Sequence, residues 1–213
     1  MNIELFIDNL AQTAVSHGDI SHPVANQYAL KSNNHCQNQI RRNNLHAYLQ
    51  KMALIQPRFM LVGEAPGYRG ARLTGIPFVS PDMLKQLPSH LSMAPLPLPD
   101  EWRHIQKEAS ATMMWETLAQ VTAVPLIWNA FPFHPHKPAN PQSNRKPTSK
   151  ELALGRPFLQ ELCQLFTIHT LIAVGNTADH ALTRGNVPHK KVRHPSHGGK
   201  QQFQQGLFAL LNN

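Results

Sequence analysis

Hydrophobic and polar positions recur along the chain with two different periods, and each period predicts one type of element. Residues 3–15 and 41–55 carry apolar side chains three or four positions apart, the spacing that gathers them on one face of a helix. We therefore predict an amphipathic helix over each of these ranges. The polar segment 26–39 between them has no period, and we assign it to a loop.

Three short apolar runs follow a different pattern, which is typical of buried strands. They cover residues 58–64, 125–131 and 170–175, and loop-forming residues flank each of them. Runs of this length without polar alternation fit strands of a parallel sheet that is covered on both faces. A fourth strand over residues 189–196 is weak by pattern, and we predict it mainly from its place in the alternation of strands and helices.

Helical patterns separate the predicted strands. We predict helices over residues 100–121, 149–166 and 176–184, with Asp100 and Ser149 as the N-caps of the first two. Strands that alternate with helices form a parallel sheet with helices on both faces. The predicted fold class is therefore α/β, a three-layer α/β/α arrangement around a central, mostly parallel four-stranded sheet.

Length and cysteine content limit the organisation of the chain. At 213 residues, one domain can bury roughly 70% of its unfolded surface without staples. We predict a single domain over residues 1–213, with residues 1–50 as a helical and loop extension packed on it. Cys36 and Cys163 are the two cysteines, too few for a disulfide framework or a four-cysteine iron–sulfur site. The histidines at 134 and 136 lack the partners of a zinc site, so we expect no metal and no other cofactor.

The charge balance points to a polyanionic partner. Lys and Arg outnumber Asp and Glu by 20 to 12, and the sequence pI is about 9.8. Such a surface attracts nucleic acid, although many soluble proteins are modestly basic without binding it. The N-terminus has no basic leader and no apolar run reaches the roughly 18 residues of a membrane span. We expect a cytoplasmic monomer that makes no contact with membranes.

Four unusual loops follow the predicted strands. They read GEAPG at residues 63–67, NAFPFHP at 129–135, GNTA at 175–178 and HPSHGG at 194–199. In parallel sheets, ligands bind beyond the carboxyl ends of the strands, where such loops meet. The sequence therefore predicts one crevice in which these four loops converge.

Read together, the loops resemble a known family. GEAPG, TGIPF at residues 74–78, Asn129 with SNRKPT and Glu151 downstream, and HPS at 194–196 resemble, in order, the motifs of the uracil-DNA glycosylase superfamily. The resemblance covers roughly residues 57–208. The first loop is most similar to the iron–sulfur branch, whereas TGIPF and NRKPT are also similar to the single-strand-selective branch. The chain lacks the cysteines of the iron–sulfur cluster.

This resemblance implies a DNA glycosylase of base-excision repair. Such an enzyme hydrolyses the N-glycosidic bond of uracil, or of a related damaged base, and leaves an abasic site in the DNA. The alternative is a non-catalytic binder of uracil-containing or single-stranded DNA on the same fold, because fold does not determine function. The sequence leaves open whether uracil, hydroxymethyluracil, xanthine or mispaired thymine is preferred, and whether the DNA is single- or double-stranded.

Three residues carry the central roles that the resemblance implies. Asn129 reads the flipped base, since an amide offers the donor and the acceptor that suit uracil O4 and N3–H. Phe78 stacks on that base. His194 donates a hydrogen bond to uracil O2 as negative charge develops there. The other interpretations are an Asn that caps a turn and a Phe of the core.

The first loop contributes a carboxylate and a close backbone. By resemblance, Glu64 positions the attacking water, and its charge favours a cationic sugar. Otherwise it is a loop Glu that binds backbone amides. Gly63, Ala65, Pro66 and Gly67 keep this backbone small and stiff, which suits close approach to uracil or phosphate.

Basic and small residues around the loops are candidates for DNA contacts. Arg69 and Arg72 replace the acidic residues of the iron–sulfur branch, either to hold a phosphate or as ordinary solvated charges. No bulky apolar wedge follows HPS directly, so we expect His197 to enter the minor groove.

The same C-terminal loop supplies three further candidates. Ser196 and Gly198 belong to the DNA-binding set, with Gly198 letting the backbone approach DNA. Lys200 completes this set. Its amine could also form a Schiff base with the abasic sugar, which would add lyase activity.

Overall fold

The structure is a computed structural model that describes residues 2–15, 22–33, 35–99 and 106–211. Its main sheet has four strands in the order β3-β2-β5-β6, and every neighbouring pair is parallel. The strands are β2 (Phe59–Gly63), β3 (Leu126–Asn129), β5 (Thr170–Val174) and β6 (Lys190–Val192). All four lie within the predicted ranges, so the predicted sheet is confirmed.

Strand order creates a switch point in the sheet. The chain passes from β2 outward to β3 on one side, then returns to β5 on the other side of β2 and continues outward to β6. The loops that leave the carboxyl ends of β2 and β5 therefore diverge in opposite directions. Open α/β sheets bind ligands in the crevice that such a divergence leaves.

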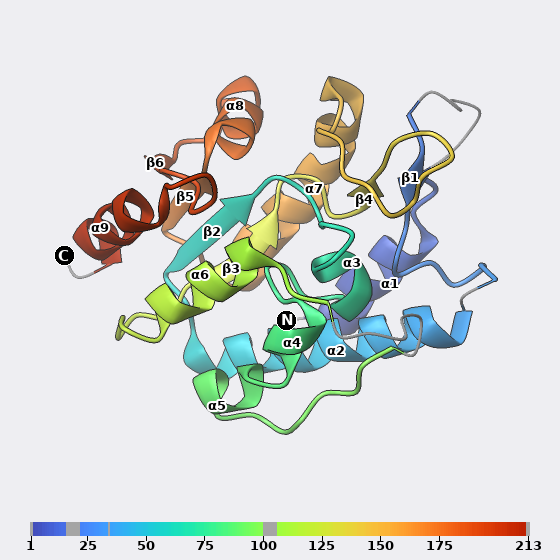
Figure 1. The fold of residues 1–213 in the computed structure, drawn as a ribbon, viewed down its shortest axis with the longest axis horizontal. Helices are drawn as coiled ribbons and strands as arrows, with labels where there is room; N and C mark the ends of the chain where they lie inside the picture. Colours follow the sequence, from blue (N-terminus) through green and yellow to red (C-terminus); the bar gives the residue numbers. More distant parts are fainter. Residues whose placement is uncertain (1, 16–21, 34, 100–105, 212–213) are drawn as a thin grey trace.

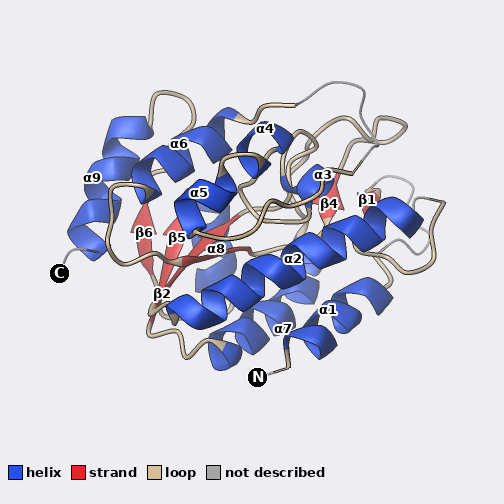
Figure 2. Ribbon diagram, turned by 90° about the horizontal axis from the view of Figure 1, so that it is seen from below, coloured by secondary structure: helices blue, strands red, loops and turns tan. Residues whose placement is uncertain are grey.

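Helices cover both faces of the sheet (Figures 1 and 2). Of the crossover helices, α6 (Ala109–Leu118) lies on one face and α7 (Ser149–Leu165) on the other. Helix α8 (Asn176–Arg184) joins β5 to β6, and α9 (Lys200–Leu211) packs beside β6. This is the three-layer α/β/α class that the alternation predicts, and the buried hydrophobic side chains form its core.

The N-terminal segment packs against this core. Helix α1 (Ile3–Gln12) lies between α2 (His35–Ile55) and α7, and a short strand β1 (Val24–Ala25) pairs antiparallel with β4 (His134–Pro135). The region assigned to a loop is thus only partly irregular, because α2 begins at His35.

The first turns of α2 carry buried polar side chains, so hydrophobic periodicity does not predict them. Asn38 and Arg42 are 3% and 4% exposed, and their side chains donate to the carbonyl oxygens of Ala29 and Tyr28. This face of the helix is therefore buried through hydrogen bonds rather than apolar contacts. A search for hydrophobic positions does not detect such a turn.

Helix ends differ slightly from the predictions. Thr148, not Ser149, caps α7, because its hydroxyl accepts from the Glu151 amide while the Glu151 carboxylate accepts from the Thr148 amide. Asp100 lies outside the described residues, and the described part of the helix predicted there, α6, begins at Ala109. Among the described helices, none combines the length and the apolar character that crossing a bilayer requires.

Three short helices lie between β2 and α6 in the chain. They are α3 (Ala71–Thr74), α4 (Pro81–Leu84) and α5 (Leu87–Leu91). Helix α3 ends at Thr74, the first residue of the TGIPF motif, and Gly75 caps it with φ 84°, a left-handed conformation that favours glycine. The motif is therefore a tight turn between two short helices.

Candidate active site

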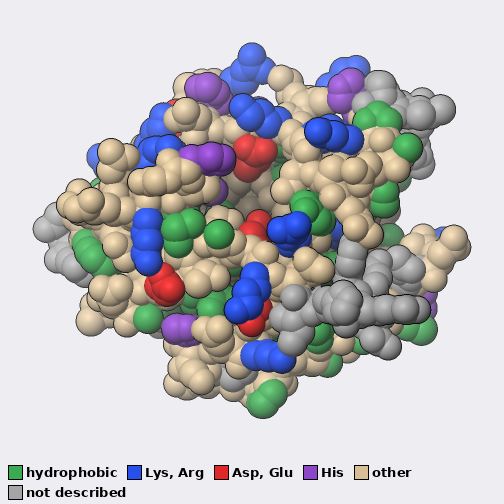
Figure 3. Space-filling model, in the orientation of Figure 1, with side chains coloured by type: hydrophobic (Ala, Val, Ile, Leu, Met, Phe, Trp, Pro, Cys, Tyr) green, Lys and Arg blue, Asp and Glu red, His purple; other side chains and the backbone are tan. Residues whose placement is uncertain are grey.

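A cavity of about 510 Å³ lies beyond the carboxyl ends of the strands. We call it the sheet-edge cavity. Figure 3 shows a hollow in the middle of this face of the molecule, bordered by Lys, Arg and His side chains with acidic side chains at its edges. The four predicted loops all contribute to its lining, which comprises residues 64–67, 144–146 and 174–177, together with Pro135, His194, Ser196, His197, Glu108 and Ser110.

The carboxyl ends of β2 and β3 bring the predicted base-reading residues together. Gly63 is paired with Asn129 in the sheet register, so the Asn129 side chain lies beside a residue without one. A Cβ atom on Gly63 would lie less than 3.0 Å from both the Asn129 Oδ1 and the Phe78 ring. Asn129 is 3% exposed, and within the described residues its side-chain amide makes no hydrogen bond. Its donor and acceptor therefore remain available to a base.

A strained backbone holds the Phe78 ring in this position. Phe78 has φ 52°, a left-handed conformation that costs a bulky residue on the order of 1–3 kcal/mol and is often found at functional sites. The indole Nε1–H of Trp115 donates to the Phe78 carbonyl at 3.0 Å. The Thr74 hydroxyl donates to the Val79 carbonyl at 2.7 Å, across the base of the same turn. Helix α6 and the turn itself thus fix the ring.

His194 lines the sheet-edge cavity and lies near the Phe78 ring. Its ring centroid lies 6.3 Å from that of Phe78. Nδ1 accepts a hydrogen bond from the Ser196 amide at 3.2 Å and lies 2.7 Å from the Ser196 hydroxyl. Because Nδ1 is an acceptor, the proton of the neutral ring is on Nε2. Burial, and then the charges of Arg193 and His197, lower the His194 pKa, which favours this neutral form.

Loop contacts hold the first motif open. The Ala130 and Phe131 amides donate to the Gly63 and Glu64 carbonyls, at 2.9 and 3.0 Å, and extend the pairing of β2 with β3 beyond the strand ends. The Glu64 side chain lines the cavity and makes no hydrogen bond to any described residue. This geometry leaves the Glu64 carboxylate available to a water molecule and gives no support to the alternative, in which it binds backbone amides.

His134 was not predicted as part of the site, yet it contacts the backbone of the GEAPG loop. It is fully buried, and Nδ1 lies 2.8 Å from the Pro66 carbonyl. Burial lowers its pKa to about 4, so the ring is neutral and carries one N–H; Nδ1 has the shorter contact, to Pro66, and Nε2 lies 3.2 Å from the Pro141 carbonyl. Asn144 performs a similar function at the rim, where its Oδ1 accepts from the Tyr68 amide at 3.0 Å.

Glu108 is a second carboxylate in the cavity, and no motif or pattern in the sequence indicates its role. It is the N-cap residue of α6, although its side chain makes no capping hydrogen bond, and its two oxygens lie against Gly67 and Gly70, in the segment that follows β2. A Cβ atom on either glycine would collide with this carboxyl group. Burial raises the pKa of Glu108 to about 7, although a hydrogen bond with Ser110 opposes the shift.

The SNRKPT segment is braced by an ion pair. The Arg145 guanidinium binds both oxygens of the Glu151 carboxylate and also donates to the His136 and Pro23 carbonyls. Arg145 therefore supports the loop although it lines the cavity. Lys146, next in the chain, is exposed at the rim and is a further candidate for a phosphate contact.

The predicted DNA-contact residues occupy different environments. Arg69 is exposed and lies over the Tyr68 ring, with 5.2 Å between its guanidinium and the ring centroid. His197 is exposed with φ 52°, and its Nδ1 lies 2.9 Å from the Ser196 hydroxyl. Lys200 pairs with Glu116 at 2.7 Å. Gly198 has open space at its Cβ position.

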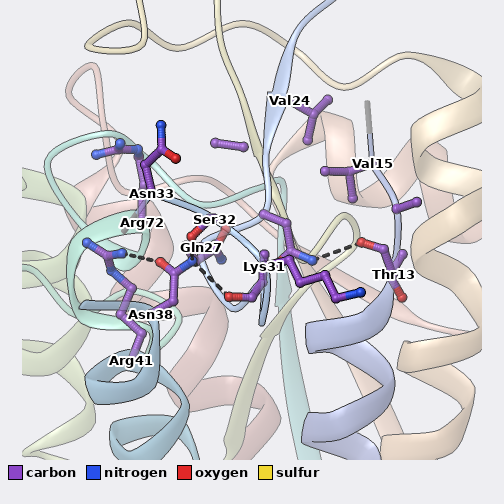
Figure 4. Close-up of a pocket in the computed structure, with 14 residues that line it drawn as sticks. Thr13, Val15, Val24, Gln27, Lys31, Ser32, Asn33, Asn38, Arg41 and Arg72 are labelled. Atoms are coloured by element: carbon purple, nitrogen blue, oxygen red, sulfur yellow. Dashed lines mark hydrogen bonds between the residues drawn. The ribbon is translucent and has the colours of Figure 1, made fainter. Parts of the chain in front are cut away.

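Arg72 is separated from these residues, since it does not line the sheet-edge cavity. It lines a second pocket of about 390 Å³, which we call the α1–α2 pocket. Figure 4 shows Arg72 on the same side of this pocket as Arg41, which donates to Asn38 Oδ1 at 2.6 Å. Of the two arginines of the YRGARL segment, Arg72 thus lines the α1–α2 pocket, whereas Arg69 is exposed and lines neither cavity.

Within the described residues, no group of three or more His, Cys, Asp or Glu side chains is arranged to hold a metal ion. The Glu64 carboxylate and the His194 imidazole line the sheet-edge cavity. The Asn129 amide and the Phe78 ring are not part of that lining and lie next to it, beside Gly63. The switch point of the parallel sheet thus brings a carboxylate, an amide, an aromatic ring and an imidazole into one region.

Comparison with known proteins identifies the family. Residues 50–211 match the family model of the uracil DNA glycosylase superfamily, and the chain belongs to this superfamily. Its fold is similar to the crystal structure of wild-type SMUG2 from Pedobacter heparinus, with a TM-score of 0.67 and 14% sequence identity over 99% of this chain and 96% of that chain. At this identity the likeness concerns the fold alone. No curated protein sequence matches the chain.

Proposed function

We propose that the protein is a DNA glycosylase that hydrolyses the N-glycosidic bond of uracil, or of a related damaged base, and leaves an abasic site. The observation that carries this proposal is the arrangement at His194. A neutral imidazole with its proton on Nε2 lies next to an aromatic ring and within the cavity of a uracil DNA glycosylase superfamily fold.

Recognition begins with a nucleotide that has left the base stack. Its base lies on the Phe78 ring, and the Asn129 amide binds the Watson–Crick edge through one donor and one acceptor. The position of Gly63 supports this role, because the absence of a side chain leaves room for the ring and the amide. Unpaired DNA bases that offer the opposite donor pattern are bound less well.

Bond cleavage sends the electron pair of the N-glycosidic bond to the base. Negative charge accumulates on the O2 atom of the departing base, and the His194 Nε2–H donates a hydrogen bond to it. A neutral donor that is already oriented costs no reorganisation when the charge develops, and such a donor contributes about 100 to 1,000-fold in rate. Ser196 keeps this donor oriented, since it holds Nδ1 as an acceptor.

The sugar that remains is an oxocarbenium-like cation. The Glu64 carboxylate stabilises its positive charge and orients a water molecule for attack on C1′. The water loses its proton to this carboxylate, or through it to solvent, and the product is the abasic sugar. Since Glu64 makes no hydrogen bond to another described residue, it is not diverted to a structural task.

Release of free uracil is the first test of this proposal. We expect the wild-type chain, with no metal added, to convert uracil-containing oligonucleotides to an alkali-labile product under single-turnover conditions. We expect His194→Ala to lower the rate by about 100-fold or more, while its affinity for the same DNA stays within a few-fold. Circular dichroism establishes that the variant is folded.

The outcome separates the enzyme from the alternative, a non-catalytic binder of uracil-containing or single-stranded DNA. Tight binding without release by the wild-type chain would establish the binder. Excision at the wild-type rate by a folded His194→Ala variant would remove the proposed mechanism. A panel of single lesions in both strand contexts then defines the substrate range.

A further inference from the structure

Glu108 is an acidic side chain in a cavity that is expected to receive DNA. Its carboxyl group lies against Gly67 and Gly70, at the turn that follows β2. The absence of a side chain on both glycines creates the space that the two oxygens occupy. The group is therefore held at the cavity wall by the shape of the first loop.

Among the described residues, no basic side chain pairs with this carboxyl group. Its one polar partner there is Ser110, whereas Glu151 binds Arg145 directly. A carboxylate without a cation partner in a half-buried place binds a proton readily. The pKa of about 7 follows from this burial, so a large fraction of the group is protonated near neutral pH.

An approaching phosphate makes protonation easier still. A flipped nucleotide that has its base near Phe78 and His194 leaves its phosphates towards the rim, where Lys146 and Arg69 are exposed. A charged carboxylate at that wall repels a phosphate, but a protonated carboxyl group can donate a hydrogen bond to it.

We propose that Glu108, in its protonated form, donates a hydrogen bond to a phosphate of the bound DNA, so that DNA binding takes up one proton. This rests on the proposed function only in that the ligand is DNA. It assigns a binding role to a residue outside the family motifs and gives the affinity of the protein a defined dependence on pH.

Other ionisable groups that face the same cavity also titrate or carry charge. They are Glu64, Arg145, Lys146, His194 and His197, with Arg69 beside the Gly67–Gly70 turn. A pH profile of the wild-type chain reports all of them together. The difference between this profile and that of Glu108→Gln isolates Glu108, because the amide is a donor of similar shape that does not titrate.

The experiment measures the Kd for a uracil-containing oligonucleotide between pH 6 and pH 9. All variants carry His194→Ala so that the DNA is not cleaved. With Glu108 present, we expect the affinity to fall by up to tenfold per pH unit above pH 7, as the uptake of one linked proton on binding requires. With Glu108→Gln we expect this component to disappear, which gives up to about 30-fold tighter binding at pH 8.5 and similar binding at pH 6.

Two further variants exclude a purely structural role. Glu108→Ala removes the donor, and we expect it to weaken binding several-fold at pH 6, where Glu108→Gln does not. Glu4→Gln removes the same charge from an exposed position in α1, and we expect its pH profile to match that of the parent protein. Equal effects of Glu108→Ala and Glu108→Gln at every pH would mean that Glu108 only supports the loop.

Stability provides a measurement without DNA. The native pKa of about 7 exceeds the usual value of 4.5, so between these values the native state binds more protons than the unfolded state. Stability from this group therefore falls as pH rises from 4.5 to 7. We expect Glu108→Gln to raise Tm relative to the parent at pH 8 and to change it little at pH 5. An equal change at both would contradict a raised pKa.

Failure of this inference is distinct from failure of the proposed function. If the wild-type chain excises uracil but Glu108→Gln has the parent's pH profile of Kd, the glycosylase stands and the role of Glu108 falls. If no uracil is released yet the two profiles differ as expected, Glu108 is a phosphate contact of a DNA-binding protein that lacks the activity.

Discussion

The sheet-edge cavity and the α1–α2 pocket are similar in size, at about 510 and 390 Å³, and both contain polar side chains and arginine. They differ in the origin of their walls. Loops from the carboxyl ends of parallel strands form most of the first, and the lining of the second comes mainly from residues 13–15 and 24–33, next to α1 and α2. Position in the fold, rather than volume or polarity, therefore marks the sheet-edge cavity as the candidate active site.

The side chains of the two cavities also differ in how they are used. In the α1–α2 pocket, Asn38 donates to Ala29 and Ser32 and accepts from Arg41, so that its amide is fully occupied by the protein. In the neighbourhood of the sheet-edge cavity, the buried Asn129 amide has no hydrogen-bond partner among the described residues. The donor and the acceptor of Asn129 are therefore not occupied by the described part of the protein.

The same substitution in each region tests this comparison most strongly. Asn129→Asp replaces a donor with an acceptor, and we expect single-turnover excision of uracil to fall by about 100-fold, since the base meets a repulsive contact. Asn38→Asp loses the donor to Ala29, and we expect it to lower the free energy of unfolding by about 1–3 kcal/mol without changing excision by the folded protein.

Excision of both uracil and cytosine should be measured for Asn129→Asp, because the altered donor pattern favours a different base. Denaturant unfolding of both variants supplies the stability comparison. If Asn129→Asp excises uracil at the wild-type rate, Asn129 does not read the base. If Asn38→Asp loses activity while folded, the α1–α2 pocket contributes to the reaction.

Filling the space beside Gly63, at the end of β2, should have a second and smaller effect on the rate of excision. A methyl group at Gly63 displaces the Phe78 ring or the Asn129 amide, because both lie within 3.0 Å of its position. We expect Gly63→Ala to lower excision by about tenfold, as a misplaced binding group does. Gly206→Ala in α9 is the control, since its Cβ would meet only the Val192 side chain, at 3.3 Å or more. Equal activities of these two variants would show that the space beside Gly63 is not needed.

Much of this site could be predicted because its residues follow strands. Gly63 and Asn129 end two short apolar runs, and parallel pairing places such ends side by side. The sequence therefore indicated the convergence of the loops around Gly63, Asn129 and His194. Phe78 was added by its motif, while its left-handed backbone depends on contacts with Trp115 that no local pattern reveals.

The residues that could not be predicted reach the site through tertiary packing. Glu108 lies before a helix whose sequence pattern suggested an earlier start, and nothing near it indicates that it contacts Gly67 and Gly70. His134 belongs to an HPH segment that invites a metal interpretation, yet its ring contacts the Pro66 carbonyl. The different environments of Arg69, which is exposed, and Arg72, which lines the α1–α2 pocket, likewise have no signal in the local sequence.

These two arginines provide the last and smallest test, because they are three residues apart and only Arg72 lines the α1–α2 pocket. Arg69 is exposed beside the Gly67–Gly70 turn, where a phosphate of the DNA can displace its counterions. We expect Arg69→Ala to weaken DNA binding a few-fold for uracil-containing and undamaged sequences alike, and to reduce the slope of log K against log salt by about 1. Arg72→Ala, in the α1–α2 pocket, should leave that slope unchanged and act on stability instead.

Fluorescence anisotropy at several salt concentrations, with thermal unfolding of both variants, measures the two effects. A reduced slope for Arg72→Ala would place DNA against the α1–α2 pocket and remove the distinction between the two regions, whereas an unchanged slope for Arg69→Ala would make it an ordinary solvated charge.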